Sequence, residues 1–144
     1  VRDDETEACG CGRKGCLEQY ASATGLVRLA KRYFEKNTKN SILTGKEITA
    51  KEVFDAAKAG DAAALDITEE FGAYLGQALV NLAATVDPAV FVIGGGVSKA
   101  GDILLETVRK YFYDHAFYGN QKTKITLATL GNDAGIYGAA KQVL

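Results

Sequence analysis

Three cysteines near the start of the chain have the types and spacing of a metal site. Cys9, Cys11 and Cys16 lie within eight residues, and the glycines between them let the backbone turn tightly enough for three sulfurs to converge. Three soft thiolates favour zinc, which takes four ligands in a structural site. The nearby acidic residues are hard oxygen donors, and the single histidine, His115, lies far along the chain. The alternative is three reduced thiols in a glycine-rich turn, since an odd number of cysteines does not suit a closed disulfide framework.

Three consecutive glycines form a second candidate site. Gly94, Gly95 and Gly96 follow an apolar run and precede a helical pattern. Such a turn lets the backbone approach a phosphate closely, and N–H groups near the start of a helix favour an anion. The segment is neither a Walker loop nor a G-x-G-x-x-G fingerprint, so an ordinary tight turn is an equal alternative. Lys99 could neutralise a phosphate here, although a solvated lysine is the simpler interpretation.

Two carboxylates complete the set of candidates. Glu18 follows Cys16 by two residues and could accept hydrogen bonds from sugar hydroxyls. From the residues alone, the simpler interpretation is a solvated residue that the helix dipole favours in a first turn. Asp133, beside Asn132 and Gly135, could cap the last helix or contact a ligand, and we expect the cap.

The hydrophobic pattern predicts an α/β protein with elements in the order helices, strand, helix, strand, helix. Helices are predicted over residues 17–36, 49–60, 61–86, 101–117 and 131–144. The continuous apolar run at 89–93 predicts a strand buried on both faces, as in a parallel sheet, and 124–130 predicts a second strand. A strand–helix–strand unit implies parallel pairing, and two such strands usually belong to a larger sheet.

Local signals refine the predicted helices. Ser22 could divide the first helix, and Thr49 with Glu52 forms a capping box. Gly72 and Gly76 lie one turn apart on the long helix, so we expect close packing there against another element or a ligand. The predicted apolar stripe of that helix is Leu65, Thr68, Phe71, Leu75, Ala78, Leu79, Leu82 and Val86. On the following helix, His115 is expected to be partly buried and not catalytic.

Composition excludes several classes of protein. The 144 residues fit one ordinary domain, and 47% apolar with 24% charged residues is typical of a globular chain. A net charge of −1 gives no reason to expect binding to nucleic acid or to a membrane surface. Because the chain opens with a polar, acidic stretch, we expect no signal peptide. Because methionine is absent and the first residue is Val1, we expect the chain to be a piece of a longer protein.

The cysteine segment resembles a known signature. CGCGRKGCLEQYAS is similar to the zinc-binding motif of the repressor–open reading frame–kinase (ROK) family, C-x-C-G-x-x-G-C-x-E-x-x-x-S, and every fixed position from Cys9 to Ser22 is present. DPAVFVIGGGVSKAGDILL resembles the strand and glycine turn of the family, and LGNDAGIYGAA resembles its C-terminal signature. The resemblance covers essentially all 144 residues. Within the family, the chain looks most like the glucokinases of Gram-positive bacteria.

The resemblance implies a fold and an activity. The fold would be the C-terminal part of an actin-like, hexokinase-type domain with a ribonuclease H-like core, with a zinc loop at 9–18 and a nucleotide-facing strand, turn and helix at 89–116. The activity would be phosphoryl transfer from ATP with magnesium to glucose, giving glucose 6-phosphate. The family's fourth zinc ligand, a histidine, and its catalytic aspartate would both precede Val1. We therefore expect this chain alone to be inactive.

The resemblance also implies roles for individual residues. Cys9, Cys11 and Cys16 would bind structural zinc, Glu18 would bind the sugar hydroxyls, and the glycines at 94–96 would face the nucleotide phosphates. Expected partners are glucose or a related hexose and ATP, in a cytoplasmic homo-oligomer, most simply a dimer. Alternatives are a ROK kinase for fructose or N-acetylmannosamine, a sugar-sensing ROK transcription repressor, and a zinc-stiffened interaction module without catalysis.

Overall fold

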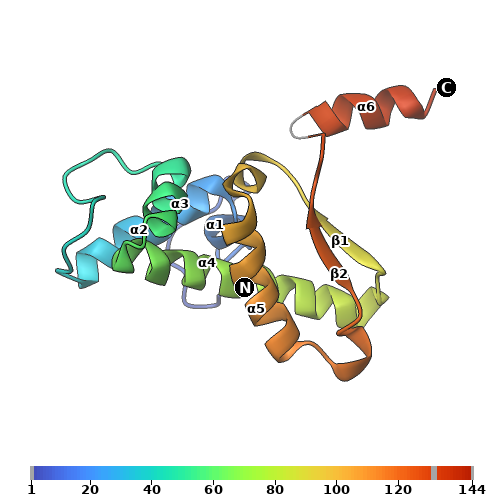
Figure 1. The fold of residues 1–144 in the computed structure, drawn as a ribbon, viewed down its shortest axis with the longest axis horizontal. Coiled ribbons are helices and arrows are strands. Elements are labelled where there is room, and N and C mark those ends of the chain that lie inside the picture. The colour runs from blue at the N-terminus through green and yellow to red at the C-terminus, as the bar shows by residue number, and fades with distance from the viewer. Residues whose placement is uncertain (1, 131–132, 144) are drawn as a thin grey trace.

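A 25-residue helix, α4 (Ala62–Val86), forms the axis of the computed structural model, which describes residues 2–130 and 133–143. Helices α1, α2, α3 and α5 all pack against it. Figure 1 shows α5 crossing α4, with the two strands to one side of the crossing and α6 standing apart. The remaining elements are α1 (Glu18–Ala21), α2 (Ala23–Lys36), α3 (Ala50–Lys58), β1 (Val90–Ile93), the 3-10 helix η1 (Gly96–Ala100), α5 (Asp102–His115), the 3-10 helix η2 (Tyr118–Asn120), β2 (Lys124–Leu127) and α6 (Ala134–Lys141).

The helix boundaries follow the predicted capping signals. Ser22 divides α1 from α2, and its hydroxyl accepts a hydrogen bond from the Gly25 N–H at 3.0 Å. Thr49 and Glu52 form the predicted capping box at the start of α3. Asp61 caps α4 by accepting from the Ala64 N–H at 2.9 Å. Each cap satisfies an amide that the first turn of the helix would otherwise leave unpaired.

The two strands pair in parallel, as predicted, with Val90 opposite Lys124 and Ile93 opposite Leu127. The prediction that the first strand is buried on both faces is wrong for this structure. Ile93 is buried, but Val90 is 45% and Val92 is 60% exposed. The physical reason is that α5 covers one face of the pair, and no other described element covers the second face.

The glycine pair on α4 brings α5 into close contact, as predicted. A Cβ atom added at Gly72 would lie 2.8 Å from the Cβ of Thr107, and one added at Gly76 would lie 2.9 Å from the Cβ of Tyr111. Carbon atoms in contact normally sit about 3.5–4.0 Å apart, so only glycine permits this crossing. The close approach fixes α5, which follows the glycine turn, on the long helix.

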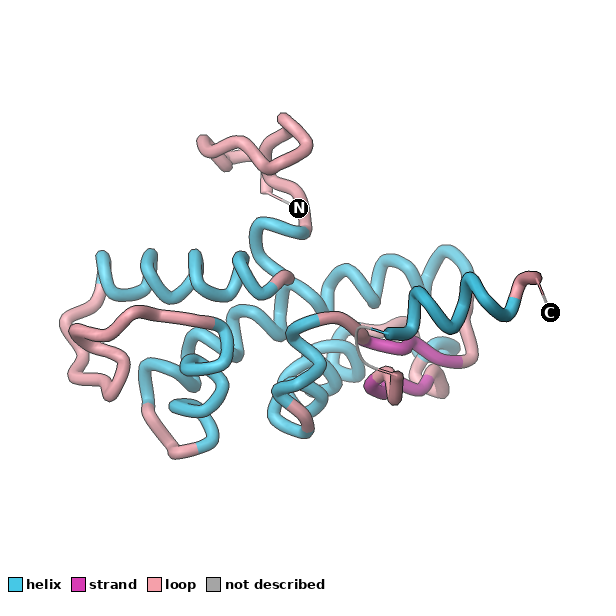
Figure 2. The backbone as a smooth tube through the Cα atoms, turned by 90° about the horizontal axis from the view of Figure 1, so that it is seen from above, coloured by secondary structure: helices cyan, strands magenta, loops and turns pink. Residues whose placement is uncertain are grey.

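The core lies where α2, α3, α4 and α5 meet, and Figure 2 shows these helices from above. Its fully buried large side chains include Tyr20, Leu26, Ile67, Phe71, Leu104 and Phe112. The predicted stripe of α4 is wrong in part, because Leu65, Leu82 and Val86 are exposed whereas Ile67 is buried. In the part of the chain that the structure describes, no helix has both the length and the apolar character to cross a membrane.

Candidate functional site

The three cysteines converge in a short loop that precedes α1. An antiparallel bridge between Ala8 and Lys14 brings the two sides of the loop together. At its tip the Cys9 N–H donates to the Arg13 carbonyl at 2.6 Å. The ligand atoms of Cys9, Cys11 and Cys16 all lie within 4.8 Å of one another, and all three cysteines are free. The sulfurs are therefore placed to bind one ion together, as their spacing predicts.

Gly15 makes the close return of the loop possible. Its φ of +68° lies in the left-handed region, which side chains other than glycine rarely adopt. A Cβ atom at this position would lie 1.9 Å from the carbonyl oxygen of Arg2. No flexible side chain could relieve that overlap, because the obstructing atom belongs to the backbone. The loop and the chain start can lie together only with glycine here.

The structure brings Glu18 to the cysteine loop. Glu18 is the first residue of α1, and its exposed carboxylate accepts a hydrogen bond from the Cys9 thiol, with the sulfur and Oε2 3.2 Å apart. The Ser22 hydroxyl donates to the Glu18 carbonyl at 2.7 Å and so steadies the same turn. A carboxylate that is exposed, held on a helix and adjacent to three sulfurs can accept hydrogen bonds from a polar ligand.

The thiols differ in acidity because their hydrogen bonds differ. The backbone N–H of Cys11 acts to lower the pKa of the Cys9 thiol, but the Glu18 carboxylate and burial outweigh it and raise this pKa to about 11. The pKa of Cys11 lies below its usual value, because the Arg13 N–H and then the other two sulfurs stabilise its thiolate. A metal ion would compete with these protons for the sulfurs, as metals do at any thiolate site.

A buried carboxylate that the sequence analysis missed fastens the segment before the loop. The side chain of Glu5 is fully buried and forms ion pairs with Arg28 at 2.7 Å and Arg32 at 3.0 Å, while the Tyr20 hydroxyl donates to it. Hydrogen bonds hold the pKa of this carboxyl well below its usual range; the one from Arg28 has the largest effect, and those from Tyr20 and the Glu7 N–H come next. The available signal was the pair of arginines one turn apart on the first predicted helix.

The glycine turn lies at the carboxyl end of β1. The strand ends at Ile93, Gly95 has a φ of +78°, and η1 leads into α5. A cavity of about 190 Å³ adjoins this turn, between α3 and η1. Its lining residues are Ala50, Lys51, Phe54, Asp55, Lys58, Gly96, Val97, Lys99 and Ala100. An apolar ring such as that of Phe54 among charged neighbours suits a ligand with both a flat and a charged part.

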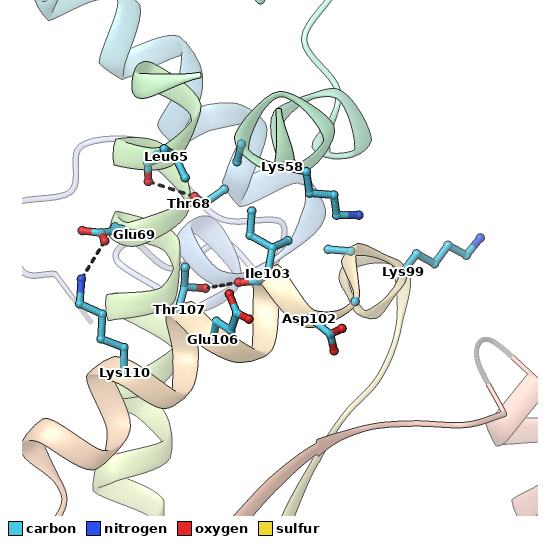
Figure 3. A pocket seen from close by; sticks show the side chains of 13 residues that line it. Lys58, Leu65, Thr68, Glu69, Lys99, Asp102, Ile103, Glu106, Thr107 and Lys110 are labelled. Atoms are coloured by element: carbon cyan, nitrogen blue, oxygen red, sulfur yellow. Dashed lines mark hydrogen bonds and ion pairs between the residues drawn. The ribbon is translucent and has the colours of Figure 1, made fainter. Parts of the chain in front are cut away.

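A wider, open groove of about 810 Å³ continues from that cavity along α3, α4 and α5 (Figure 3). Lys58, Lys99 and Ala100 line both hollows. Figure 3 shows Lys58 and Lys99 beside the start of α5, and Lys110 paired with Glu69 further along at 2.8 Å. Lys99 is exposed at the junction, where its charge can reach a ligand in the small cavity.

The structure corrects the expectations for two other residues. Asp133 occupies the N-cap position of α6, but its side chain makes no capping hydrogen bond, because its φ of −80° and ψ of −7° are helical and not the extended values of a cap. His115 is exposed, not partly buried, since it ends α5, where its ring stacks on Tyr111 with centroids 3.9 Å apart. Gly135 lies in the first turn of α6 with open space around it, and Asn132 falls outside the described residues.

Comparison with known proteins gives a consistent result. The sequence matches the model of the ROK family over residues 1–144. The glucokinase of Halalkalibacterium halodurans is 43% identical over 135 residues, which are 90% of this chain and 41% of that protein. The N-acetyl-D-glucosamine kinase of Vibrio cholerae is 32% identical over 132 residues, 92% of this chain and 40% of that protein.

Among solved structures, a ROK family glucokinase from Streptomyces griseus, in complex with glucose and AMPPNP, superposes with a TM-score of 0.84 at 37% identity. The match covers 96% of this chain and 47% of that one. In the described residues, six α-helices and two parallel strands form a mixed α/β fold, and this fold is shared with a sugar kinase structure. The chain spans less than half the length of the proteins that it matches.

Proposed function

The chain belongs to the ROK family, and we propose that it forms the C-terminal portion of an ATP-dependent glucokinase, which converts glucose to glucose 6-phosphate. The observation that carries the proposal is the position of Glu18, whose exposed carboxylate begins α1 directly beside the three-sulfur loop. The 43% identity to a glucokinase supports glucose as the sugar. We place the protein in the cytoplasm, since three free cysteines suit a reducing compartment.

In this proposal Glu18 holds the sugar. Its charged carboxylate accepts hydrogen bonds from ring hydroxyls, and such charge-assisted bonds orient a ligand strongly. The donor set fits zinc, because three soft thiolates lie within 4.8 Å of one another. Zinc bound by Cys9, Cys11 and Cys16 would stiffen the loop as a structural ion. The proximity of the Cys9 sulfur to Glu18 Oε2, 3.2 Å apart, supports this arrangement, because it places the loop beside the carboxylate that would bind the sugar.

The nucleotide would occupy the hollow beside the glycine turn. Gly94, Gly95 and Gly96 allow the backbone to approach phosphates, and the cavity between α3 and η1 would take the nucleoside. Lys99 at the junction would add positive charge. Magnesium would accompany ATP. The chemistry of such a transfer depends on positioning and charge stabilisation, and the resemblance assigns the general base to residues outside this chain, so no catalytic residue is assigned here.

The test of the sugar role uses the full-length protein that carries these residues. ADP release is measured with glucose, N-acetylglucosamine, N-acetylmannosamine and fructose as substrates. Glu18→Gln should raise the KM for glucose about tenfold to a hundredfold, because it removes a charged acceptor, with little change in the KM for ATP. The matched control is Glu47→Gln, at an exposed glutamate in the loop before α3. Unchanged glucose kinetics in Glu18→Gln would refute the sugar role.

The same substrate panel decides between two sugars. The 32% identity to an N-acetyl-D-glucosamine kinase favours N-acetylglucosamine as the second candidate. A kcat/KM for N-acetylglucosamine above that for glucose would replace the proposed substrate while leaving the kinase assignment intact. Absence of ADP release with every sugar would overturn the assignment itself.

Metal and nucleotide binding are tested separately. Elemental analysis of the full-length protein should find about one zinc per chain, and Cys11→Ser should lose it. Gly95→Val should weaken binding of a fluorescent ATP analogue, because a side chain is strained at a φ of +78° and would crowd the phosphates. Full zinc retention in Cys11→Ser, or full analogue affinity in Gly95→Val, would contradict the corresponding role.

A further inference from the structure

Gln19 is a buried polar side chain with hydrogen bonds at both ends of its amide. It lies between Glu18 and Tyr20 on α1 and is 9% exposed. Its Oε1 accepts a hydrogen bond from the Cys16 N–H at 3.1 Å. Its Nε2 donates to the Glu7 carbonyl at 3.0 Å. One side chain thus joins two backbone positions that are nine residues apart in sequence.

These two backbone positions are the two sides of the base of the cysteine loop. Glu7 lies on the incoming side, two residues before Cys9, and Cys16 is the last sulfur on the outgoing side. The bridge between Ala8 and Lys14 and the bond from Cys9 to Arg13 close the tip of the loop. Gln19 closes the base. Without its amide, the Cys16 N–H and the Glu7 C=O would lose these partners, which is costly for partly buried backbone groups.

The helix that carries Gln19 is itself held firmly. The next residue, Tyr20, is 1% exposed, donates its hydroxyl to the buried Glu5 and packs its ring on Tyr74 with centroids 4.6 Å apart. Glu5 is fixed in turn by Arg28 and Arg32 of α2. Gln19 therefore extends toward the loop from α1, a short helix whose orientation is fixed by its contacts with the protein core.

We propose that Gln19 is a positioning residue, which sets the spacing of the three sulfurs before any metal binds and holds their loop against the turn that carries Glu18. The part of this inference that concerns metal affinity rests on the proposed function. The part that concerns sulfur spacing does not. The loop is accordingly preorganised by the Gln19 amide, and the metal binds to a shape that already exists.

The first test uses the metal-free 144-residue chain. Dibromobimane becomes fluorescent when it alkylates two neighbouring thiols, and Cys11 and Cys16 have sulfurs 3.5 Å apart. Gln19→Leu keeps a comparable volume but removes both hydrogen bonds, and it should slow the cross-link about fivefold to tenfold. Gln121→Leu, at an exposed glutamine, is the matched control and should react like the wild type. An equal rate in Gln19→Leu and the wild type would overturn the proposal.

The second test is titration with Co²⁺, whose thiolate bands report the geometry of the site. Residues that hold metal ligands by hydrogen bonds commonly change metal affinity by about 10- to 100-fold, so Gln19→Leu should weaken Co²⁺ binding by that factor and alter the bands. If the wild type itself binds no Co²⁺ while the cross-link is slowed in the variant, sulfur positioning by Gln19 stands and the metal part of the proposed function fails. Equal Co²⁺ affinity and spectra in the two proteins would overturn the role in metal binding.

A second variant keeps the proposal open to refutation if Gln19→Leu does not fold. Gln19→Glu retains an acceptor for the Cys16 N–H but, when ionised, cannot donate to the Glu7 carbonyl. Its cross-linking rate should fall below that of the wild type, with circular dichroism confirming the fold. A wild-type rate in Gln19→Glu would show that the bond to Glu7 is not needed, and the two-ended role would be wrong.

Discussion

Replacing Gly72 with alanine tests whether the crossing of α4 and α5 is as close as the structure shows. Alanine is favoured over glycine in a helix interior by about 1 kcal/mol, so with free space Gly72→Ala would stabilise the protein. The added Cβ atom would instead lie 2.8 Å from the Cβ of Thr107, and 3.0 and 3.1 Å from its backbone carbon and oxygen. Two of these three atoms belong to the backbone, so rotation of the Thr107 side chain cannot relieve the overlap.

The expected magnitude follows from these distances. Carbon contacts of about 3.5–4.0 Å require α4 and α5 to separate by roughly 0.5–1 Å at this point. Overpacking of this kind costs about 1–3 kcal/mol, and because backbone atoms are involved we take the upper part of the range, about 2–3 kcal/mol. Subtracting the gain of about 1 kcal/mol in helix propensity leaves a net loss of about 1–2 kcal/mol. For a chain of this size, that loss corresponds to a Tm lower by roughly 3–7 °C.

Thermal unfolding followed by circular dichroism measures the effect, with Ala84→Gly as the matched control. Ala84 lies on the same helix at an exposed position, so the control reports helix propensity without packing and should cost about 1 kcal/mol. The reasoning is refuted if Gly72→Ala raises the Tm by about the amount that Ala84→Gly lowers it. That result would show that the two helices leave room for a methyl group.

Three further predictions concern the site and its surroundings. Glu5→Gln should destabilise the protein at pH 7. The folded-state pKa of Glu5 lies below its ordinary value of 4.5, so its contribution to the free energy of unfolding is complete above that pH and is lost on acidification. Urea titrations should therefore show that the stability difference between variant and wild type shrinks as the pH falls below 4.5. Gly12→Ala should lower the free energy of unfolding by about 1–2 kcal/mol, because residue 12 has a left-handed φ of +81°. Gly15→Ala should lower the Tm further, because its added Cβ atom would also overlap the backbone of Arg2. Equal losses of stability in the two variants would contradict that overlap. The 144-residue chain should self-associate through the exposed strand face, so light scattering from a monodisperse monomer would contradict the expectation.

Much of the local structure could be predicted because its causes are local in sequence. The cap at Ser22, the capping box at Thr49 and the cap at Asp61 each involve partners three residues apart. The convergence of the cysteines depends on a turn within eight residues. The glycine pair at 72 and 76 could be interpreted correctly because its cost to the helix requires compensation in any fold.

The errors concern contacts between distant parts of the chain. Glu5 is paired with Arg32, 27 residues away, and Gln19 with the Glu7 carbonyl, 12 residues away. The two arginines one turn apart indicate an acidic partner, but the local pattern does not identify Glu5 as that partner, and no local signal indicates the contact of Gln19. The buried stripe of α4 differs from the predicted one because the position of α5, and not periodicity alone, decides which side chains are covered. The strand at 89–93 was expected to be buried on both faces, but the described elements cover one face.

Arg109 has a consequence for how this sheet can be extended. The Lys124 N–H donates to Ala89, directly before β1, and the Ala128 N–H donates to Ile93 of β1. Because successive residues of a strand face opposite edges, Ile125 directs its backbone groups to the outer edge of β2. There the Arg109 guanidinium donates to the Ile125 carbonyl, with Nε 3.2 Å from the oxygen. An additional strand would have to displace this arginine to join at β2. The sheet is thus open to growth in one direction, and a further strand, whatever molecule supplies it, is steered to the opposite side of β1, to the backbone of Val90 and Val92.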